Sequence, residues 1–355
     1  MSKFSGKRLS SLVAYTPGEQ PKDKKYIKLN TNESPFSPSK KAKKEAALAA
    51  KRLELYPDPE CRELHARLAE CCGLDASEVL VTNGSDEILN FAFMAFCDDE
   101  TPAVFPDITY GFYPVFADVN GIKYEEIPLL PDFTIRASDY FGKKATIFIA
   151  NPNAPTGIAL PLSDIEEILK NNPDNVVVID EAYVDFGGES AISLIPKYKN
   201  LLVTQTFSKS RSMAGARLGF GAGDRELIAD LNTIKYSTNP YNINRMTMAA
   251  GLGVLSDEEY TKKNCKTVCE VREFTEKELS KLGFETTESV TNFIFARHNS
   301  AGGKMLYEEL RRRGILVRHF DKPRLSEYLR ITVGARRDME ALIKTISDIL
   351  KEMNV

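Results

Sequence analysis

The sequence predicts an α/β protein in which a larger unit with a mostly parallel sheet is followed by a smaller α/β unit. Three observations lead to this prediction. Short continuous runs of apolar and β-branched residues are typical of strands that are buried on both faces of a parallel sheet. Helical stretches separate these runs through most of the chain, as in repeated βα units. A length of 355 residues is enough for two domains and a substantial core.

The first part of the chain is expected to be an arm, residues 1–40, that packs with the smaller unit. Gly18 and Pro21 interrupt regular structure there, and residues 26–29 favour one short strand. The larger unit is expected over residues 41–243. Its strands are expected at 79–81, 103–105, 123–127, 145–150, 176–179, 201–203 and 219–223, and its helices at 40–53, 62–72, 83–97 and 110–119.

The smaller unit is expected over residues 244–355. A long helical stretch opens it and is expected to break near Ser256. The remaining strands are expected at 292–296, 315–318 and 328–333, and the helices at 244–283, 304–313 and 337–353.

Composition narrows the classes of function. The net charge of -3 argues against a nucleic-acid binder, which usually carries a basic face or tail. No apolar stretch is long enough to span a membrane, and the N-terminus lacks a signal-peptide pattern, so we expect a cytoplasmic protein. The six cysteines show no paired metal-binding spacing and the three histidines none that suits them, so we expect reduced thiols and no metal site.

Three polar features follow predicted strands, where ligands bind in open α/β sheets. Lys209 lies in a turn of small residues, Asp180 ends a buried strand, and the segment TNGSDE opens a helix. Each has a plainer explanation: a surface lysine, an aspartate that caps a loop, and Ser85 as a simple N-cap. Together with Arg217 they provide an amine, a buried carboxylate and an anion site, which is what pyridoxal phosphate requires.

The order of the motifs strengthens this interpretation. The segments are LNTNESPFSPS, YPDP, TNGSDEI, PDITYGFY, NPNAPTG, VIDEAYVDF, TFSKSRSMAGARLGF, ILVRHF and LRITVG. In this order, and over nearly the whole chain, the sequence resembles the fold-type I aminotransferases, and within them the histidinol-phosphate aminotransferases. The resemblance implies a large domain with a mostly parallel, seven-stranded sheet, a smaller α/β C-terminal domain and an N-terminal arm.

The resemblance also implies which residues bind pyridoxal phosphate. Lys209 would bind it covalently, and Asp180 would keep its ring nitrogen protonated. Tyr183 would contact the ring oxygen, and Tyr110 would stack on the ring. The phosphate would be bound by Gly84, Ser85, Asp86, Thr206, Ser208 and Arg217. Tyr56 would reach the cofactor phosphate of the partner subunit, which makes the active unit a homodimer.

One motif departs from the family. The family usually has PNNPTG where residues 152–157 here are PNAPTG. The asparagine before Pro-Thr-Gly normally contacts the ring oxygen, and Ala154 takes its place. Asn153 is the nearest amide and therefore the candidate contact, although neighbouring side chains of an extended segment point in opposite directions. A rearranged backbone, Tyr183 alone, or water are the alternatives.

Four further residues are expected to bind the substrate. Arg330 matches the clamp for the substrate carboxylate, which it would hold through two parallel hydrogen bonds. Arg318 matches the residue that binds the substrate phosphate. Tyr15 and Tyr241 match tyrosines near that phosphate, Tyr241 reaching across from the partner.

The implied reaction is a step of histidine biosynthesis: L-histidinol phosphate and 2-oxoglutarate give imidazole acetol phosphate and glutamate. Lys209 would carry the proton as general base and then acid. A threonine-phosphate decarboxylase and an aromatic amino acid aminotransferase resemble the same family and remain alternatives; Arg318 argues against the latter. A nicotinamide-dependent oxidoreductase would need a glycine-rich fingerprint between strand and helix, whereas residues 219–223 favour a strand. A regulator that binds the cofactor without catalysis would carry a DNA-binding domain or basic stripe, and the sequence has neither.

Overall fold

The computed structural model describes residues 2–6, 9, 12–16 and 18–354. Residues 1, 7–8, 10–11 and 17, which belong to the predicted arm, and residue 355 lie outside the described residues. Within the described part of the chain, no helix combines the length and the apolar character needed to cross a membrane.

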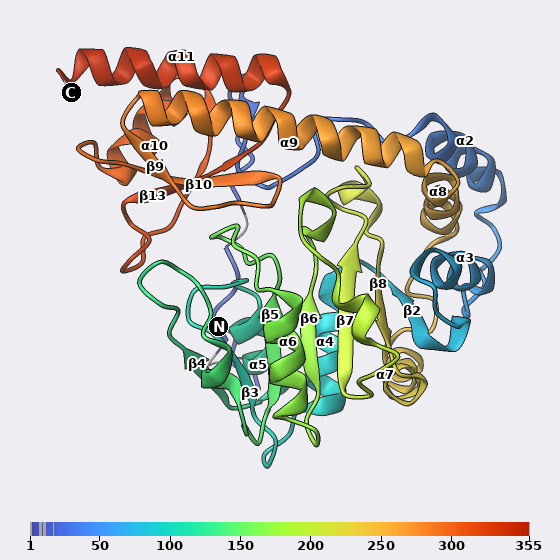
Figure 1. Ribbon diagram of the computed structural model, residues 1–355. Coiled ribbons are helices and arrows are strands. Elements are labelled where there is room, and N and C mark those ends of the chain that lie inside the picture. Colours follow the sequence, from blue (N-terminus) through green and yellow to red (C-terminus); the bar gives the residue numbers. More distant parts are fainter. Residues whose placement is uncertain (1, 7–8, 10–11, 17, 355) are drawn as a thin grey trace.

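The larger unit is built on a seven-stranded sheet with the order β2-β8-β7-β6-β5-β3-β4 (Figure 1). The strands are β2 (Val79–Thr82), β3 (Ala103–Pro106), β4 (Tyr124–Ile127), β5 (Thr146–Ala150), β6 (Val177–Asp180), β7 (Leu201–Thr206) and β8 (Gly219–Gly223). Only β8 runs against its neighbours, pairing antiparallel with both β2 and β7. All residues of β5, β6 and β7 are buried, because helices cover both faces of the sheet. The predicted sheet is confirmed.

Helices cover the sheet on both faces, and the first of them in the chain packs mainly on the last. They are α2 (Lys40–Ala49), α3 (Arg62–Cys72), α4 (Ser85–Phe96), α5 (Tyr113–Asn120), α6 (Leu162–Lys170), α7 (Arg225–Thr238) and α8 (Arg245–Leu255). Val177 and Ile179 of β6 share one core with α3, α6 and α8, whereas Val178 shares the other with α4, α5 and α7. The alternation follows from the two-residue period of a strand. Short 3-10 helices occur at Ala50–Arg52, Ala76–Glu78, Ala137–Tyr140, Val184–Phe186, Ala191–Leu194 and Ala214–Ala216.

One helix of the larger unit begins later than expected. The prediction of a helix over 110–119 is wrong at its start, because α5 begins at Tyr113 with Pro114 in its first turn. Proline is tolerated only there, since its ring would clash with the preceding turn of a longer helix. The loop that this leaves free carries Tyr110.

The smaller unit holds a four-stranded antiparallel sheet, ordered β12-β13-β10-β9. Its strands are β9 (Phe284–Thr286), β10 (Phe293–His298), β12 (Arg318–His319) and β13 (Tyr328–Thr332), and its helices are α9 (Glu258–Lys281), α10 (Gly303–Arg312) and α11 (Arg336–Glu352). The expected single strand over 315–318 is wrong: it divides at Val317. β11 (Ile315–Leu316) pairs in parallel with β1 (Ile27–Lys28) of the arm, whereas β12 pairs with β13.

The hydrophobic cores of the larger and the smaller unit show to which unit each helix belongs. Ala250 and Val254 of α8 lie in the core of the large sheet, and a Cβ at Gly253 would stand 2.7 Å from the Ala42 Cα of α2. The core of the smaller unit takes in α9 from Cys265 onward and Leu29 of the arm. The predicted division at 243/244 therefore separates α8 from the core in which it packs. In Figure 1, α9 runs across the top from α2 and α8 to the smaller unit.

Candidate active site

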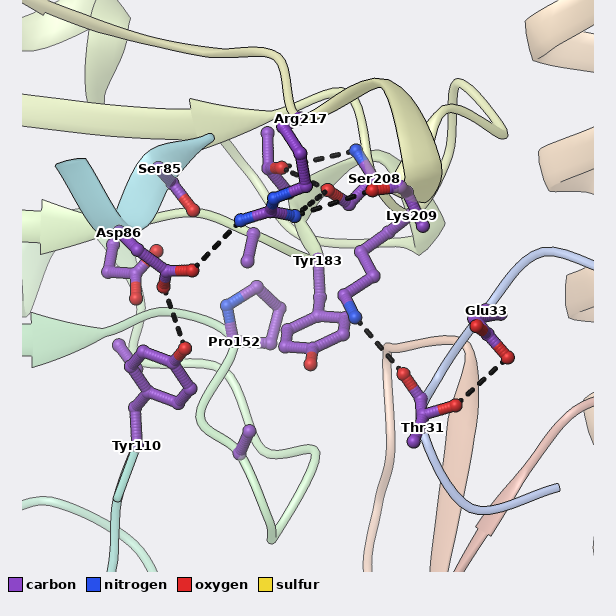
Figure 2. Close-up of a pocket in the computed structure, with 16 residues that line it drawn as sticks. Thr31, Glu33, Ser85, Asp86, Tyr110, Pro152, Tyr183, Ser208, Lys209 and Arg217 are labelled. Carbon is purple, nitrogen blue, oxygen red and sulfur yellow. Dashed lines mark hydrogen bonds and ion pairs between the residues drawn. The ribbon is translucent and has the colours of Figure 1, made fainter. Parts of the chain in front are cut away.

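A cavity of about 280 Å³ lies at the carboxyl ends of β5, β6 and β7, beside the N-terminus of α4 (Figure 2). Parallel strands bring polar residues from distant parts of the chain to this edge of the sheet. The predicted residues that line the cavity are Ser85, Asp86, Tyr110, Asp180, Tyr183, Thr206, Ser208, Lys209 and Arg217.

Lys209 projects into this cavity from the turn after β7. Its Nζ donates to the Thr31 carbonyl oxygen over 3.2 Å and lies 5.7 Å from the centre of the Tyr183 ring (Figure 2). The buried Phe207 anchors the turn immediately before it. Lys209 therefore presents an amine on the wall of the cavity, where it can meet a ligand.

Asp180 stands at the end of β6, next to Thr204 of β7. The Tyr113 hydroxyl donates to its Oδ2 over 3.2 Å, while its Oδ1 is buried without a hydrogen-bond partner among the described residues. Burial raises the pKa of Asp180 to about 7, and the nearby charge of Asp86 adds to the effect. A buried acceptor that lacks a donor costs free energy, so this oxygen favours a ligand that brings a cationic N–H.

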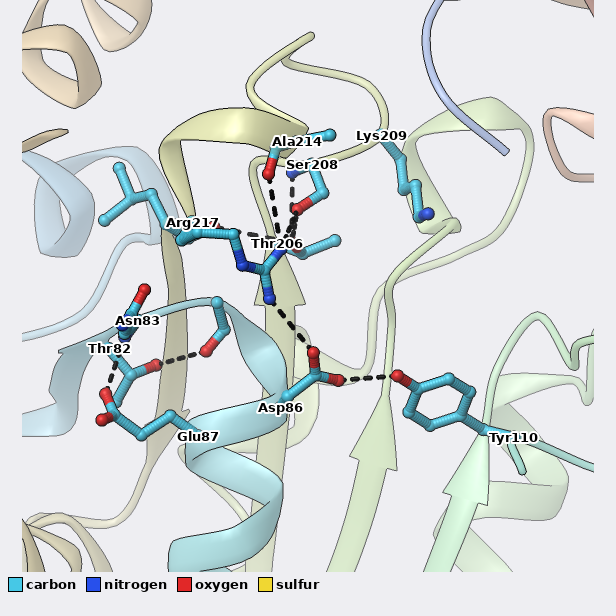
Figure 3. A network of polar contacts seen from close by, with 12 residues as sticks. Thr82, Asn83, Asp86, Glu87, Tyr110, Thr206, Ser208, Lys209, Ala214 and Arg217 are labelled. Atoms are coloured by element: carbon cyan, nitrogen blue, oxygen red, sulfur yellow. Dashed lines mark hydrogen bonds and ion pairs between the residues drawn. The ribbon is translucent and has the colours of Figure 1, made fainter. Parts of the chain in front are cut away.

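The N-terminus of α4 faces Arg217 across the other end of the cavity (Figure 3). Arg217 Nη2 lies 3.1 Å from Asp86 Oδ2. Gly84, at φ 79°, is the N-cap, so the plainer explanation of Ser85 as N-cap is wrong. No side chain of the described residues caps this end, which leaves helix N–H groups for an anion. A Cβ at Gly84 would stand 2.6 Å from Arg217 Nη2 and would shift the guanidinium, and the positive φ itself favours glycine.

Hydroxyl groups complete this anion site. The Ser208 N–H donates to Thr206 Oγ1 over 3.1 Å, and Thr206 Oγ1 donates to Ser208 Oγ over 3.0 Å. Arg217 Nη1 donates to Ser208 Oγ at 3.5 Å (Figure 3). Arg217 has a left-handed backbone with φ 56°, a conformation that is uncommon for a residue with a side chain and that is found at functional sites.

Tyr110 closes the cavity on the side of the larger unit. Its hydroxyl donates to Asp86 Oδ1 over 2.7 Å, so Tyr110, Asp86 and Arg217 form one chain of polar contacts (Figure 3). Burial and the charge of Asp86 raise the pKa of Tyr110, which keeps the hydroxyl protonated as a donor.

Asn153 and Ala154 point in opposite directions. The Asn153 amide donates to the Ile108 carbonyl (2.9 Å) and to Thr156 Oγ1 (3.1 Å), and its oxygen accepts from Thr109 Oγ1 (2.8 Å). Ala154, by contrast, lines the cavity. The Asn153 side chain therefore holds the loop together, and the methyl group of Ala154 faces the cavity.

A second cavity, of about 530 Å³, meets the first at Lys209, Tyr183 and Ala154. The predicted substrate residues Tyr15, Arg318 and Arg330 line it.

The two arginines lie directly opposite each other on β12 and β13. Arg330 Nη2 donates to the Asn30 carbonyl oxygen over 3.2 Å, and in the described structure its Nε is buried without a partner. Burial lowers the pKa of Arg330. Like charges that face each other across a sheet are unfavourable, so this pair favours a bound anion.

Tyr56 and Tyr241 lie outside both cavities. Their rings stack with centroids 4.7 Å apart, and their exposed fractions are 79% and 44%. The structure therefore brings these two predicted residues together with each other, at the surface, and apart from the site within the same chain.

Among the residues that the sequence did not predict, two bond to side chains of the site. Tyr113 donates to Asp180, and the Asn32 amide donates to the Tyr183 hydroxyl over 3.0 Å. Tyr113 begins α5, and no local pattern in its segment indicates its contact with the end of β6. Asn32 lies in the quoted segment LNTNESPF, but no local pattern indicates its contact with a residue so far away in the chain.

Comparison with known proteins gives consistent results. The model of the family "Aminotransferase class I and II" matches residues 24–346. Histidinol-phosphate aminotransferase of Marinomonas sp. (strain MWYL1) is 50% identical over 98% of this chain and 100% of its own length.

Solved structures share the fold. Histidinol-phosphate aminotransferase of Sinorhizobium meliloti, determined in complex with pyridoxal-5'-phosphate, matches with a TM-score of 0.88 at 20% identity, covering 99% of both chains. L-threonine-O-3-phosphate decarboxylase of Porphyromonas gingivalis matches with a TM-score of 0.80 at 21% identity, covering 92% of this chain and 99% of its own. Fold alone therefore does not separate transamination from decarboxylation.

Proposed function

Since this chain belongs to the class I and II aminotransferase family, we propose that it transfers an amino group from L-histidinol phosphate to 2-oxoglutarate with pyridoxal phosphate as cofactor. The products are imidazole acetol phosphate and glutamate. One observation carries the proposal: two cavities meet at Lys209, one with an unpaired buried carboxylate oxygen and an anion site, the other with two facing arginines. The relative that is 50% identical over its whole length supports this choice of substrate.

The residues of the first cavity fit the cofactor. The unpartnered Oδ1 of Asp180 suits a pyridinium N–H, and Arg217 with the open end of α4 suits a phosphate. The amine of Lys209 would hold the group covalently. When bound, pyridoxal phosphate supplies a ring that withdraws electrons from the substrate carbon that carries the amine.

The chain contributes acid–base chemistry and orientation. Lys209 takes the proton from the amine-bearing carbon of the substrate and holds it, as a general base at the junction of the two cavities. The Asp180 carboxylate stabilises a positive charge on a group bound in the first cavity. The Tyr113 hydroxyl orients this carboxylate. Arg318 binds the phosphate of histidinol phosphate, and Arg330 binds a carboxylate of 2-oxoglutarate. The two arginines together therefore bind the anionic groups of both substrates.

A single half-reaction tests the function. The protein loaded with pyridoxal phosphate is mixed with excess L-histidinol phosphate and no keto acid, and the visible absorbance band is followed. We expect histidinol phosphate to bleach the band faster than L-threonine phosphate or L-phenylalanine. Release of CO2 from threonine phosphate with recovery of the band would identify a decarboxylase instead. A protein that takes up no pyridoxal phosphate and stays colourless would refute the cofactor.

Replacing Arg330 by glutamine is expected to raise the KM for 2-oxoglutarate by about 10²-fold, because hydrogen bonds to a charged group contribute about 1.5–3 kcal/mol each. Steady-state kinetics with the keto acid varied measure this effect. Arg297→Gln is the matched control: Arg297 lies on the neighbouring strand β10 and pairs with Glu285 at 2.7 Å on the surface. Equal KM values in the two variants would remove Arg330 from the substrate site.

We propose further that the active unit is a homodimer in which Tyr56 contacts the cofactor phosphate of the partner. The stacked pair of Tyr56 and Tyr241 is exposed, and the apolar side chains of Leu53 and Leu55 beside it are 58% and 45% exposed. Exposed apolar groups of this kind are typical of protein interfaces.

Mixed dimers test this arrangement. We expect Tyr56→Ala and Lys209→Ala subunits, each weakly active or inactive alone, to regain activity when mixed. The Tyr56→Ala subunit keeps its lysine and receives an intact Tyr56 from its partner, so one site in each mixed dimer is complete. Absence of any gain, although sedimentation shows mixed dimers, would place Tyr56 in the site of its own chain.

The cytoplasm is the proposed location. All six cysteines are free thiols in the structure, and free thiols persist in reducing compartments. Recovery of the enzyme from an oxidising compartment in cell fractionation would contradict this.

A further inference from the structure

We propose that Asn32 is a positioning residue that directs the Tyr183 hydroxyl proton toward the ring oxygen of the cofactor. Asn32 would thereby compensate for Ala154, which offers the cavity no hydrogen-bond donor. This inference rests on the proposed function, since it concerns the cofactor named there.

The segment that follows β5 cannot supply the donor. Ala154 lines both cavities with a methyl group. The amide of Asn153 is buried and already bonded to Ile108, Thr156 and Thr109. Tyr183 also lines both cavities, so its hydroxyl is the donor available at this side of the site.

The partners of Asn32 orient its side chain. Its Oδ1 accepts from the Thr332 hydroxyl over 3.1 Å, and Thr332 Oγ1 in turn accepts from the Asn32 N–H over 2.9 Å. The Asn32 carbonyl oxygen accepts from the Asn292 amide over 2.9 Å. In this arrangement Thr332 donates to the amide oxygen, and the NH2 group faces Tyr183, whose oxygen lies 3.0 Å from it.

This orientation sets the polarity of the Tyr183 hydroxyl. A phenol oxygen that accepts from an amide keeps its own proton for another acceptor, and accepting one hydrogen bond strengthens the donation of the next. The ring of Tyr183 is held edge-on against Phe293, with centroids 5.1 Å apart and planes at 89°. The proton is therefore left for an acceptor in the cavities that Tyr183 lines.

The contact also joins the two units. Asn32 belongs to the arm and is 1% exposed, Thr332 lies on β13 of the smaller unit, and Tyr183 follows β6 of the larger one. Asn32 thus reaches Tyr183 only when the smaller unit and the arm are docked on the larger unit. We infer that docking of the smaller unit and orientation of this donor occur together.

Asn32→Asp is the test, because the carboxylate keeps the shape but accepts hydrogen bonds only. Thr332 can still donate to it, whereas the Tyr183 proton turns toward the introduced carboxylate and away from the cavity. The visible absorbance band of the loaded protein is measured without substrate as the pH is varied. The readout is the pH at which half of the change in this band has occurred, called the midpoint. We expect the midpoint to rise by about one pH unit, as for the loss of a hydrogen bond to a charged oxygen.

The same substitution in a Tyr183→Phe background separates positioning from direct electrostatics. If Asn32 acts through Tyr183, the aspartate produces no further shift there. An equal shift in both backgrounds, or a fully loaded Asn32→Asp protein with an unchanged midpoint, overturns the inference. A wild-type protein that takes up no pyridoxal phosphate overturns the proposed function, and this inference with it. Melting of the cofactor-free variants confirms that they are folded.

Discussion

Replacing Lys209 by alanine is expected to lower the transamination rate by about 10⁴-fold or more, because the side chain serves both as the covalent anchor and as the proton carrier. The fold should survive, since the only hydrogen bond that Nζ donates in the described structure is to the Thr31 carbonyl oxygen. Borohydride reduction of the loaded protein, followed by mass spectrometry, measures the covalent attachment. The wild type should gain one cofactor per chain and the variant none.

Two controls sharpen this experiment. Lys197→Ala removes an exposed lysine that pairs with Glu166 at 3.4 Å, and it should retain full attachment and rate. A small primary amine added to Lys209→Ala should restore part of the rate, because it replaces the missing base in a cavity of sufficient size. A variant that still forms a reducible adduct at full stoichiometry would remove Lys209 from its assigned role.

Asp180→Asn is expected to stabilise the cofactor-free protein while it impairs the loaded enzyme. In the folded state the pKa of Asp180 is raised from 3.8 to about 7, chiefly by burial. The native state therefore keeps a proton that the unfolded chain has lost, so the free energy of unfolding falls as the pH rises from about 4 to about 7. Above about pH 7 this lowers the free energy of unfolding by up to about 4 kcal/mol, at about 1.4 kcal/mol for each unit by which the pKa is raised.

Asparagine carries no charge and avoids this penalty. At about pH 8 the cofactor-free variant should therefore melt several degrees above the wild type, whereas below about pH 5 the two should converge. The loaded variant should lose about 10²-fold or more in turnover, because the cofactor nitrogen loses its buried counter-charge. Melting curves across this pH range and steady-state rates measure the two effects. A variant that is less stable than the wild type at every pH would contradict the assignment of the unpaired oxygen.

Glu181 is the matched control for this variant. It is the next residue of the chain, and burial raises its pKa to about 7 as well. Its carboxylate, however, is hydrogen-bonded by Ser190, the Ala191 N–H and Gln205, on the side away from the cavity. Glu181→Gln should alter the pH dependence of stability and leave the response of the bound cofactor to substrate unchanged.

Much of the large sheet and of the first cavity could be predicted from local pattern. The runs that became β5, β6 and β7 are continuous in apolar residues because helices cover both faces. Parallel strands end at a common edge, so an aspartate at the end of one and a lysine just after the next must meet. The late start of α5 could also have been found, since Pro114 permits only a first-turn position.

Other features had no local signal. The division of the expected strand at Val317 depends on which partners lie beside β11 and β12, and those partners are the arm and β13. The roles of Tyr113 and Asn32 depend on where their hydroxyl and amide groups stand after packing. Nothing in either segment alone distinguishes them from other polar residues of a helix or a loop.

The sequence by itself determined the α/β class, the succession of strands along the chain and the presence of Asp180, Lys209 and Arg217 at or just after the ends of those strands. These follow from the period of apolar residues and from the polar residues that end each run, both of which are local properties of the chain. The tertiary structure alone decided that Asp180 keeps an unpaired oxygen, that Arg318 faces Arg330, and that Asn32 bonds Tyr183. The physical reason is that burial and hydrogen-bond polarity are set by groups far apart in the chain, whose meeting depends on how the two units and the arm pack together.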